Sequence, residues 1–174
     1  MKSYILVLAF LVLGFTSFAQ SQLKIGYVDS EVIMTQFSES IKAQGDLEAY
    51  ANKLTVKRDS MQLKLQQDYA DYQKQMQNMP EDKKKETETK LIKMEQELRD
   101  FIQLNFGQGT GEIYKKQQEL MKPIQEKIFA AIEKVAKSEG LQFVFDKSGD
   151  IVLLYADPAY DVTFKVLDGL KRGN

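Results

Sequence analysis

Residues 41–136 decide the fold: they begin IKAQGDLEAYANKLTVKRDSMQLKLQQDYADYQKQMQ, break at Asn78-Met79-Pro80, and resume with EDKKKETETKLIKMEQELRDF. Apolar residues recur in both halves every three or four positions, which is the spacing of one face of a helix. A single helix over 41–78 would be about 55 Å long, more than a small globular core covers. We therefore expect the halves to pack antiparallel, as a coiled-coil hairpin over residues 41–138 with its tip near 78–80.

The two apolar series form the expected seam between the helices. Their members are Leu47, Ala51, Leu54, Met61, Leu65, Tyr69, Tyr72, Met76 and Met79 in the first half, and Leu91, Met94, Leu98, Ile102, Phe106, Ile113, Leu120, Ile124, Ile128, Ala131 and Val135 in the second. Arg58 and Gln117 fill polar positions within these series. The spacing slips once near Leu65, which predicts a local relaxation of the supercoil.

Three glycines, Gly107, Gly109 and Gly111, interrupt the returning half. They should cost about 2–3 kcal/mol of helix propensity relative to alanine. Helical pattern lies on both sides, whereas a phosphate-binding loop follows a strand, so we expect a kink or flexible joint. On this basis alanine at the three positions should raise helicity and thermal stability. Pro123 predicts a further bend or break in the same helix.

Composition excludes several classes of function. Lysine and arginine total 24 against 25 aspartates and glutamates, so no strong field attracts nucleic acid. The chain has no cysteine and no histidine, which excludes thiol catalysis, disulfides, imidazole bases and the usual zinc ligands. We expect no cofactor, no metal and no enzymatic activity.

Residues 1–19 read as a cleaved secretory signal peptide. Lys2 precedes an apolar run from Tyr4 to Phe15, and Thr16-Ser17-Phe18-Ala19 supplies small residues before the expected cleavage point. The run is short for a bilayer span, which needs about 20 residues, although an uncleaved membrane anchor is the alternative. The mature chain is expected to be exported and soluble.

The two ends of the chain are expected to form a small body. Residues 20–40 predict a strand and a short helix for which Asp29 and Ser30 are candidate caps. Residues 139–174 predict a β-hairpin, 141–145 with 151–155, and a helix capped by Asp161. Three short strands bury too little apolar surface to be stable alone, so association of bodies is expected. The candidate oligomerisation residues are Ile25, Tyr27, Val28, Phe143, Phe145, Val152 and Leu154.

Together these features resemble the Skp/OmpH family over the whole mature chain. The resemblance is carried by KIGYVDS (24–30), the long Gln- and Lys-rich helical hairpin, LQFVFD (141–146) and YADPAYDVT (155–163), the last as in Bacteroidetes-type members. It implies an α+β, mostly α fold, with a helical-hairpin arm on a β-rich oligomerisation body. It also implies a periplasmic holding chaperone, a homotrimer that encloses unfolded outer-membrane proteins between its arms without ATP.

The arm tip supplies the candidate contact residues. Tyr69, Tyr72, Met76 and Met79 are adaptable side chains suited to client binding, although their spacing equally suits the seam. Lys83, Lys84 and Lys85 are a candidate contact for anionic lipid, or a solvated helix face. Known members of the family are basic, which favours electrostatic capture of acidic clients. This chain is nearly neutral, so the same mode of capture is not expected of it.

Two other functions remain open. The first is a structural or adaptor coiled coil of the cell envelope that binds one folded partner. The second is a carboxylate-based hydrolase, which would use two of Asp146, Asp150, Asp157 and Asp161. Turns and helix caps explain each of these aspartates without catalysis.

Overall fold

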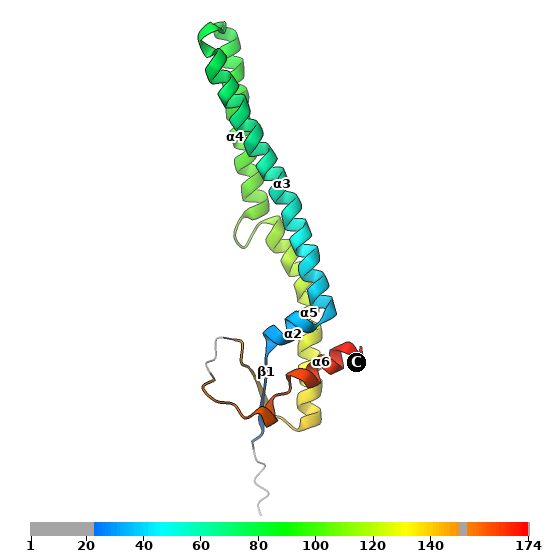
Figure 1. Cartoon of the computed structure of the whole chain (residues 1–174). Coiled ribbons are helices and arrows are strands. Elements are labelled where there is room, and N and C mark those ends of the chain that lie inside the picture. Colours follow the sequence, from blue (N-terminus) through cyan, green and yellow to red (C-terminus); the bar gives the residue numbers. More distant parts are fainter. Residues whose placement is uncertain (1–22, 150–152, 174) are drawn as a thin grey trace, which may run out of the picture.

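A computed structural model of the chain describes residues 23–149 and 153–173. It has a long helical arm that rises from a small body, and both ends of the described chain lie in the body (Figure 1). The elements in chain order are β1 (Ile25–Val28), α2 (Ser30–Gln36), α3 (Ser38–Gln75), η2 (Met76–Asn78), α4 (Glu81–Phe106), α5 (Glu112–Glu139), β2 (Phe143–Asp146), η3 (Pro158–Tyr160) and α6 (Thr163–Lys171). The predicted signal peptide lies outside the described residues.

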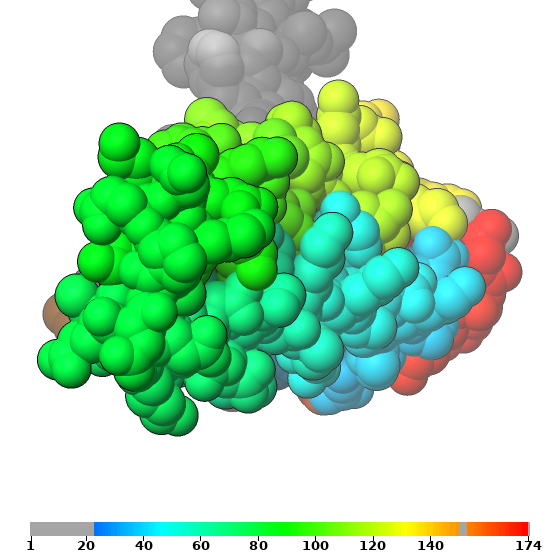
Figure 2. Space-filling view, turned by 90° about the horizontal axis from the view of Figure 1, so that it is seen from above, coloured from blue at the N-terminus to red at the C-terminus, as the bar shows by residue number. Residues whose placement is uncertain are grey.

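The arm is the predicted helical hairpin. Its outgoing side is one unbroken helix, α3, which contacts α4 in the distal half of the arm and α5 in the proximal half. Viewed from above the tip, α3 and the returning helices form two adjacent ridges (Figure 2). Helix α3 begins at Ser38, three residues before the predicted start of the arm at 41, and it ends one turn before the predicted tip.

The tip turns where Pro80 requires it. One turn of 3-10 helix, η2, follows α3, and Met79 and Pro80 then adopt extended backbone. Proline lacks a backbone N–H and fixes φ, so it suits the residue that precedes a helix rather than a helix interior. Glu81 and Asp82 fill the first turn of α4, where negative charge is favourable.

The returning side is broken once. Residues 107–111 form a loop between α4 and α5, as the glycines predicted, and the loop bulges from the arm about halfway along it (Figure 1). Of the bend or break predicted at Pro123, the break is wrong, because α5 continues through it to Glu139, and the bend stays a prediction. Gly140 then ends α5 at φ 68°, the left-handed conformation that glycine adopts without strain.

The body contains a two-stranded parallel sheet among the described residues, not the predicted hairpin. Strand β2 pairs with β1 in the register Ile25 to Phe143 and Val28 to Asp146. Residues 153–155 are not in a strand, and residues 150–152 of the predicted hairpin lie outside the described residues. On its other edge β1 forms a single parallel bridge to Asp161, through the N–H of Val162 and the carbonyl of Tyr27 at 3.0 Å.

The core lies where the arm meets the body. It is built from one face of the sheet, from α2, from the first turns of α3, from the lower part of α5 and from α6. Its buried residues are Val28, Ile33, Phe37, Ala43, Ile124, Ile128, Ala131, Val162, Val166 and Leu167. The distal arm contributes no residue to this core. The stability of the distal arm therefore depends on the seam between α3 and α4.

Candidate functional site

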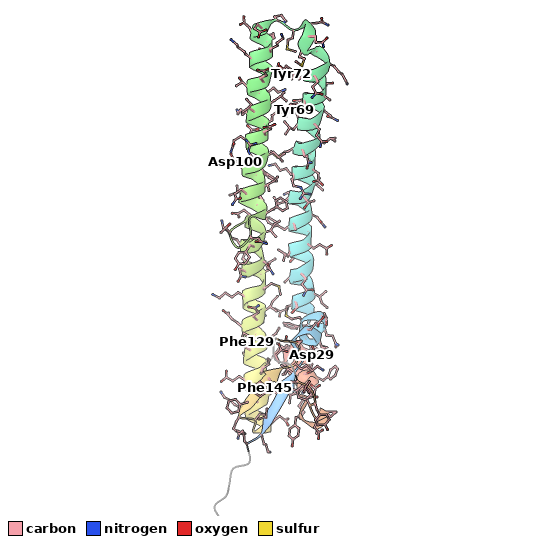
Figure 3. All side chains as sticks on the ribbon, turned by 90° about the vertical axis from the view of Figure 1, so that its left-hand side faces the viewer. Asp29, Tyr69, Tyr72, Asp100, Phe129 and Phe145 are labelled. Atoms are coloured by element: carbon pink, nitrogen blue, oxygen red, sulfur yellow. The ribbon has the colours of Figure 1, made fainter. Side chains whose placement is uncertain are left out.

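The four predicted client-contact residues lie in the last turns of α3 and in and after η2, and Figure 3 shows Tyr69 and Tyr72 near the distal end of the arm. The four differ in exposure. Tyr72 and Met79 are half-buried in the seam, whereas Tyr69 and Met76 are about 40% exposed, at 40% and 41%. The Tyr72 hydroxyl donates to the Glu88 carboxylate across the seam at 2.5 Å. That hydrogen bond raises the pKa of Tyr72. Tyr69 and Met76 are therefore the pair available to a partner.

Polar contacts fasten the distal seam. Asp68 accepts from Lys90 of α4 at 3.0 Å and from Lys64 of its own helix at 3.4 Å. The hydrogen bond from Lys90 lowers the pKa of Asp68, against a smaller opposing effect of burial. Buried apolar contact is sparse here, since Leu91 is the buried apolar residue of α4. The distal hairpin is thus held by contacts that solvent and salt weaken.

Two cation–π contacts continue this fastening toward the loop. Lys57 lies over the ring of Phe101 at 5.1 Å, and Arg58 lies over the ring of Phe106 at 5.2 Å. The two rings also contact each other, with centroids 6.4 Å apart. The polar position at Arg58, which interrupted the predicted seam, is therefore a packing position. Such exposed contacts are each worth about 0.5–1 kcal/mol.

The tip lysines are already engaged with carboxylates. Lys83 pairs with Glu86 at 2.6 Å, and Lys84 pairs with Glu81 at 3.2 Å. The hydrogen bond to Glu86 raises the pKa of Lys83. Lys85 adds a third positive charge, but the cluster as a whole is balanced by neighbouring acids. Contact between these lysines and anionic lipid stays a prediction that this geometry does not strengthen.

The glycine loop has a defined shape. The N–H of Gly111 donates to the carbonyl of Gly107 at 2.8 Å, and Gly109 has φ +70°. A Cβ on Gly107 would lie 2.6 Å from the carbonyl oxygen of Gln103, and one on Gly111 would lie 2.7 Å from that of Asn105. Each glycine therefore has a backbone role that the sequence alone did not reveal.

One face of the sheet is exposed. Residues at odd positions of the two parallel strands share this face, and Ile25 is 40% exposed and Phe143 54% exposed. With residues 153–160 they border an apolar groove of about 300 Å³, lined by Ile25, Gly26, Tyr27, Phe145, Leu153, Tyr155, Ala156, Asp157 and Tyr160. Leu154 and Tyr155 are 95% and 83% exposed. These residues form the outer sheet face, and they include five of the seven predicted oligomerisation residues.

Two predicted oligomerisation residues are not part of this face. Val28 is 2% exposed and points into the core of its own chain, because even-numbered positions of the strands face the helices. Val152 lies outside the described residues. The outer sheet face therefore retains Ile25, Phe143, Phe145 and Leu154 from the predicted set as exposed or half-buried residues, whereas Tyr27 lines the groove but is only 9% exposed.

The aspartates considered for hydrolysis have structural partners. Asp146 accepts hydrogen bonds from the N–H and hydroxyl groups of both Ser30 and Ser148, at 2.5–3.1 Å. Asp157 caps η3, and Asp161 accepts from the N–H of Thr163 at 2.9 Å. Asp150 lies outside the described residues. These hydrogen bonds are those of turns and helix caps. The described residues contain no group of three or more metal-ligating side chains.

Sequence reasoning missed a set of exposed apolar residues along the arm. Val56 and Leu63 lie on the outer ridge of α3, 68% and 55% exposed. Tyr114 and Phe129 of α5 are 41% and 67% exposed, and Phe129 lies well below the tip (Figure 3). The three-and-four spacing that defines the seam includes about one apolar residue per helical turn. Apolar residues next to the seam therefore do not stand out in the sequence.

The chain is similar to a known protein family in sequence and to a solved structure in fold. None of the curated proteins matches the sequence. A solved structure from Caulobacter crescentus CB15, of a candidate outer membrane chaperone (OmpH-like), has the same fold: TM-score 0.73, 12% identity, covering 87% of this chain and 86% of that chain. No helix of residues 23–149 and 153–173 is long and apolar enough to cross a membrane. The family model for outer membrane protein (OmpH-like) matches residues 24–170, and the chain belongs to that family.

Proposed function

We propose that this protein is an ATP-independent periplasmic holdase, which binds unfolded outer-membrane proteins between its helical arms and prevents their aggregation. The supporting observation is the arm: a long two-helix hairpin that reaches beyond its own core and exposes aromatic side chains on its returning helix α5. Membership of the family agrees with this function. The location follows from the predicted signal peptide.

We also propose that the bodies associate, as a homotrimer, through the outer sheet face. Ile25, Phe143, Leu154 and Tyr155 expose apolar surface there without a partner in the single chain. Such contiguous patches mark interfaces. Association brings several arms together, so that many weak contacts hold one client with high avidity.

Light scattering tests the holdase function. A denatured outer-membrane β-barrel protein is diluted from urea with and without stoichiometric amounts of the mature chain, with no nucleotide present. Suppressed aggregation is the expected result, and unchanged aggregation would reject the proposal.

An adaptor coiled coil is the alternative function, and identification of the proteins captured from the cell envelope distinguishes it from a holdase. Several outer-membrane proteins would support a holdase, and one dominant folded partner would support an adaptor.

Sedimentation equilibrium tests the oligomer. We expect Phe143→Ser to lower the association state, because it removes apolar surface from the outer sheet face. Leu63→Ser on the arm is the matched control, since Leu63 is 55% exposed and Phe143 54%. A monomeric wild-type chain at micromolar concentration would contradict association through the body. Equal association of the Phe143→Ser variant would contradict the assigned face.

A further inference from the structure

Helix α5 carries a second stripe beside its seam. Its inward stripe is Ile113, Gln117, Leu120, Ile124, Ile128, Ala131 and Val135, and each member is followed directly by one of Tyr114, Gln118, Met121, Gln125, Phe129, Ile132 and Ala136. The second set repeats in the same steps of three and four, so it occupies one face, turned by about 100° from the first. We name this set the α5 side stripe.

The α5 side stripe contains no charged residue. The helix is otherwise rich in lysine and glutamate, and these pair with each other at other positions. Lys116 pairs with Glu119 at 2.8 Å, and Lys127 pairs with Glu39 of α3 at 2.6 Å. The stripe therefore presents apolar and amide groups in a molecule whose other helix faces carry many charges.

Four members of the stripe are exposed, namely Tyr114, Gln118, Gln125 and Phe129. Ile128 is 5% exposed, whereas its neighbour Phe129 is 67% exposed. Met121 and Ile132 are half-buried and border the seam. Isolated apolar residues are common on protein surfaces, but a continuous charge-free stripe with exposed aromatic residues marks an interaction surface.

We infer that the α5 side stripe is the client-contact surface of the arm, and that it takes apolar and aromatic segments of unfolded chains without regard to their charge. This inference rests on the proposed holdase function. Methionine and glutamine side chains adapt to varied neighbours, and exposed aromatic rings offer large contact area at low entropic cost. With nearly balanced charge overall, the chain lacks a strong field that would select clients by sign.

The composition of the stripe argues against a second copy as its occupant. Tyr114 and Phe129 are roughly 22 Å apart along the helix, at 1.5 Å per residue. Gln118 and Gln125 are exposed between them. A permanent interface has a continuous apolar core, which this alternation of aromatic and amide groups does not provide. An unfolded chain can instead place any of its apolar side chains at either ring.

A pair of double variants tests the inference. Tyr114→Ser with Phe129→Ser removes both exposed rings of the stripe, and Val56→Ser with Leu63→Ser removes apolar residues of similar exposure from the outer ridge of α3, where Asp59 lies between them. Aggregation of a urea-denatured outer-membrane β-barrel protein is measured by light scattering at low and high salt, and association by sedimentation. We expect the α5 variant to need on the order of tenfold more protein for the same suppression. The α3 variant should suppress aggregation as well as the wild type does. High salt should not change the suppression by the wild type or by the α3 variant.

The other outcomes overturn the inference. If the wild type suppresses aggregation and the α5 variant does so equally well, the stripe is not the contact surface, although the holdase function stands. A lower association state of the α5 variant would make the stripe an interface between copies. Loss of wild-type suppression at high salt would show that capture depends on charge. A wild type that leaves aggregation unchanged would reject the proposed function, and this inference with it.

Discussion

Alanine in the glycine loop should destabilise the protein. The helix propensities of the sequence suggested the reverse, because glycine is the poorer helix former. The loop geometry decides otherwise. At Gly109 the backbone has φ +70°, and at Gly111 a Cβ would lie 2.7 Å from both the Asn105 carbonyl oxygen and the Gly107 nitrogen. These are backbone atoms, which cannot move aside as a flexible side chain does.

The magnitudes follow from these positions. A left-handed conformation costs an L-residue about 1–2 kcal/mol, and overpacking against fixed atoms costs about 1–3 kcal/mol. The lower entropy of the unfolded chain with alanine offsets about 0.4–1 kcal/mol of either cost. We therefore expect net losses in unfolding free energy of about 1 kcal/mol for Gly109→Ala and about 1–2 kcal/mol for Gly111→Ala.

Urea unfolding followed by far-ultraviolet circular dichroism measures the effect, at one fixed protein concentration because association shifts apparent stability. Gly45→Ala is the matched control. Gly45 lies inside α3, and a Cβ there meets nothing within 4 Å. That variant should gain about 0.5–1 kcal/mol. If Gly111→Ala is as stable as the wild type, or gains helix content, the loop can be absorbed into a continuous helix and the reasoning is refuted.

Three further predictions concern the core, the body and the distal seam. Ile128→Ala should lower the unfolding free energy by about 2–4 kcal/mol, measured in urea, and Phe129→Ala by less than about 0.5 kcal/mol, because the first residue is 5% exposed and the second 67%. Burial alone would raise the pKa of Asp146, but the hydrogen bonds from Ser30 and Ser148 lower it below its ordinary value. Its stabilisation is therefore present above the unfolded pKa and lost as the pH falls through the folded one, so the stability difference between wild type and Asp146→Asn should shrink below about pH 4 in urea titrations. Arg58→Gln should lower the unfolding free energy by about 0.5–1 kcal/mol in the same measurement. An unchanged unfolding free energy would show that the contact between Arg58 and Phe106 does not stabilise the distal seam.

Local signals predicted the helices well. Asp29 caps α2 by accepting from the N–H of Val32 at 2.9 Å, and Gly140 ends α5, both as the residue types indicated. The tip at Pro80 and the break at the glycines were equally visible, because the requirements of proline and glycine are local. Pro123 does not break α5, since its loss of one backbone hydrogen bond is outweighed by the packing of Ile124 and Ile128 in the core.

The strand pairing could not be read from local signals. Residues 146–150 have the composition of a hairpin turn, and the N–H of Gly149 does donate to the carbonyl of Asp146 at 3.4 Å. The Asp146 side chain, however, accepts from Ser30, more than a hundred residues earlier in the chain. That contact joins the ends of two parallel strands whose connection is the whole arm. Turn chemistry cannot report such a partner, since only the closed fold brings β1 and β2 together.

The two halves of the arm differ in what holds them, and this difference separates the proposed roles. In the proximal half, α3 packs on α5, whose Ile124, Ile128 and Ala131 join the core of the body. In the distal half, ion pairs, cation–π contacts and the Tyr72 hydrogen bond replace buried area. Contacts of that kind are individually weak, so the distal half of the arm should open before the proximal half does. The α5 side stripe lies on the proximal half, on the body side of the glycine loop. A client bound there would therefore be held by the most stable part of the arm.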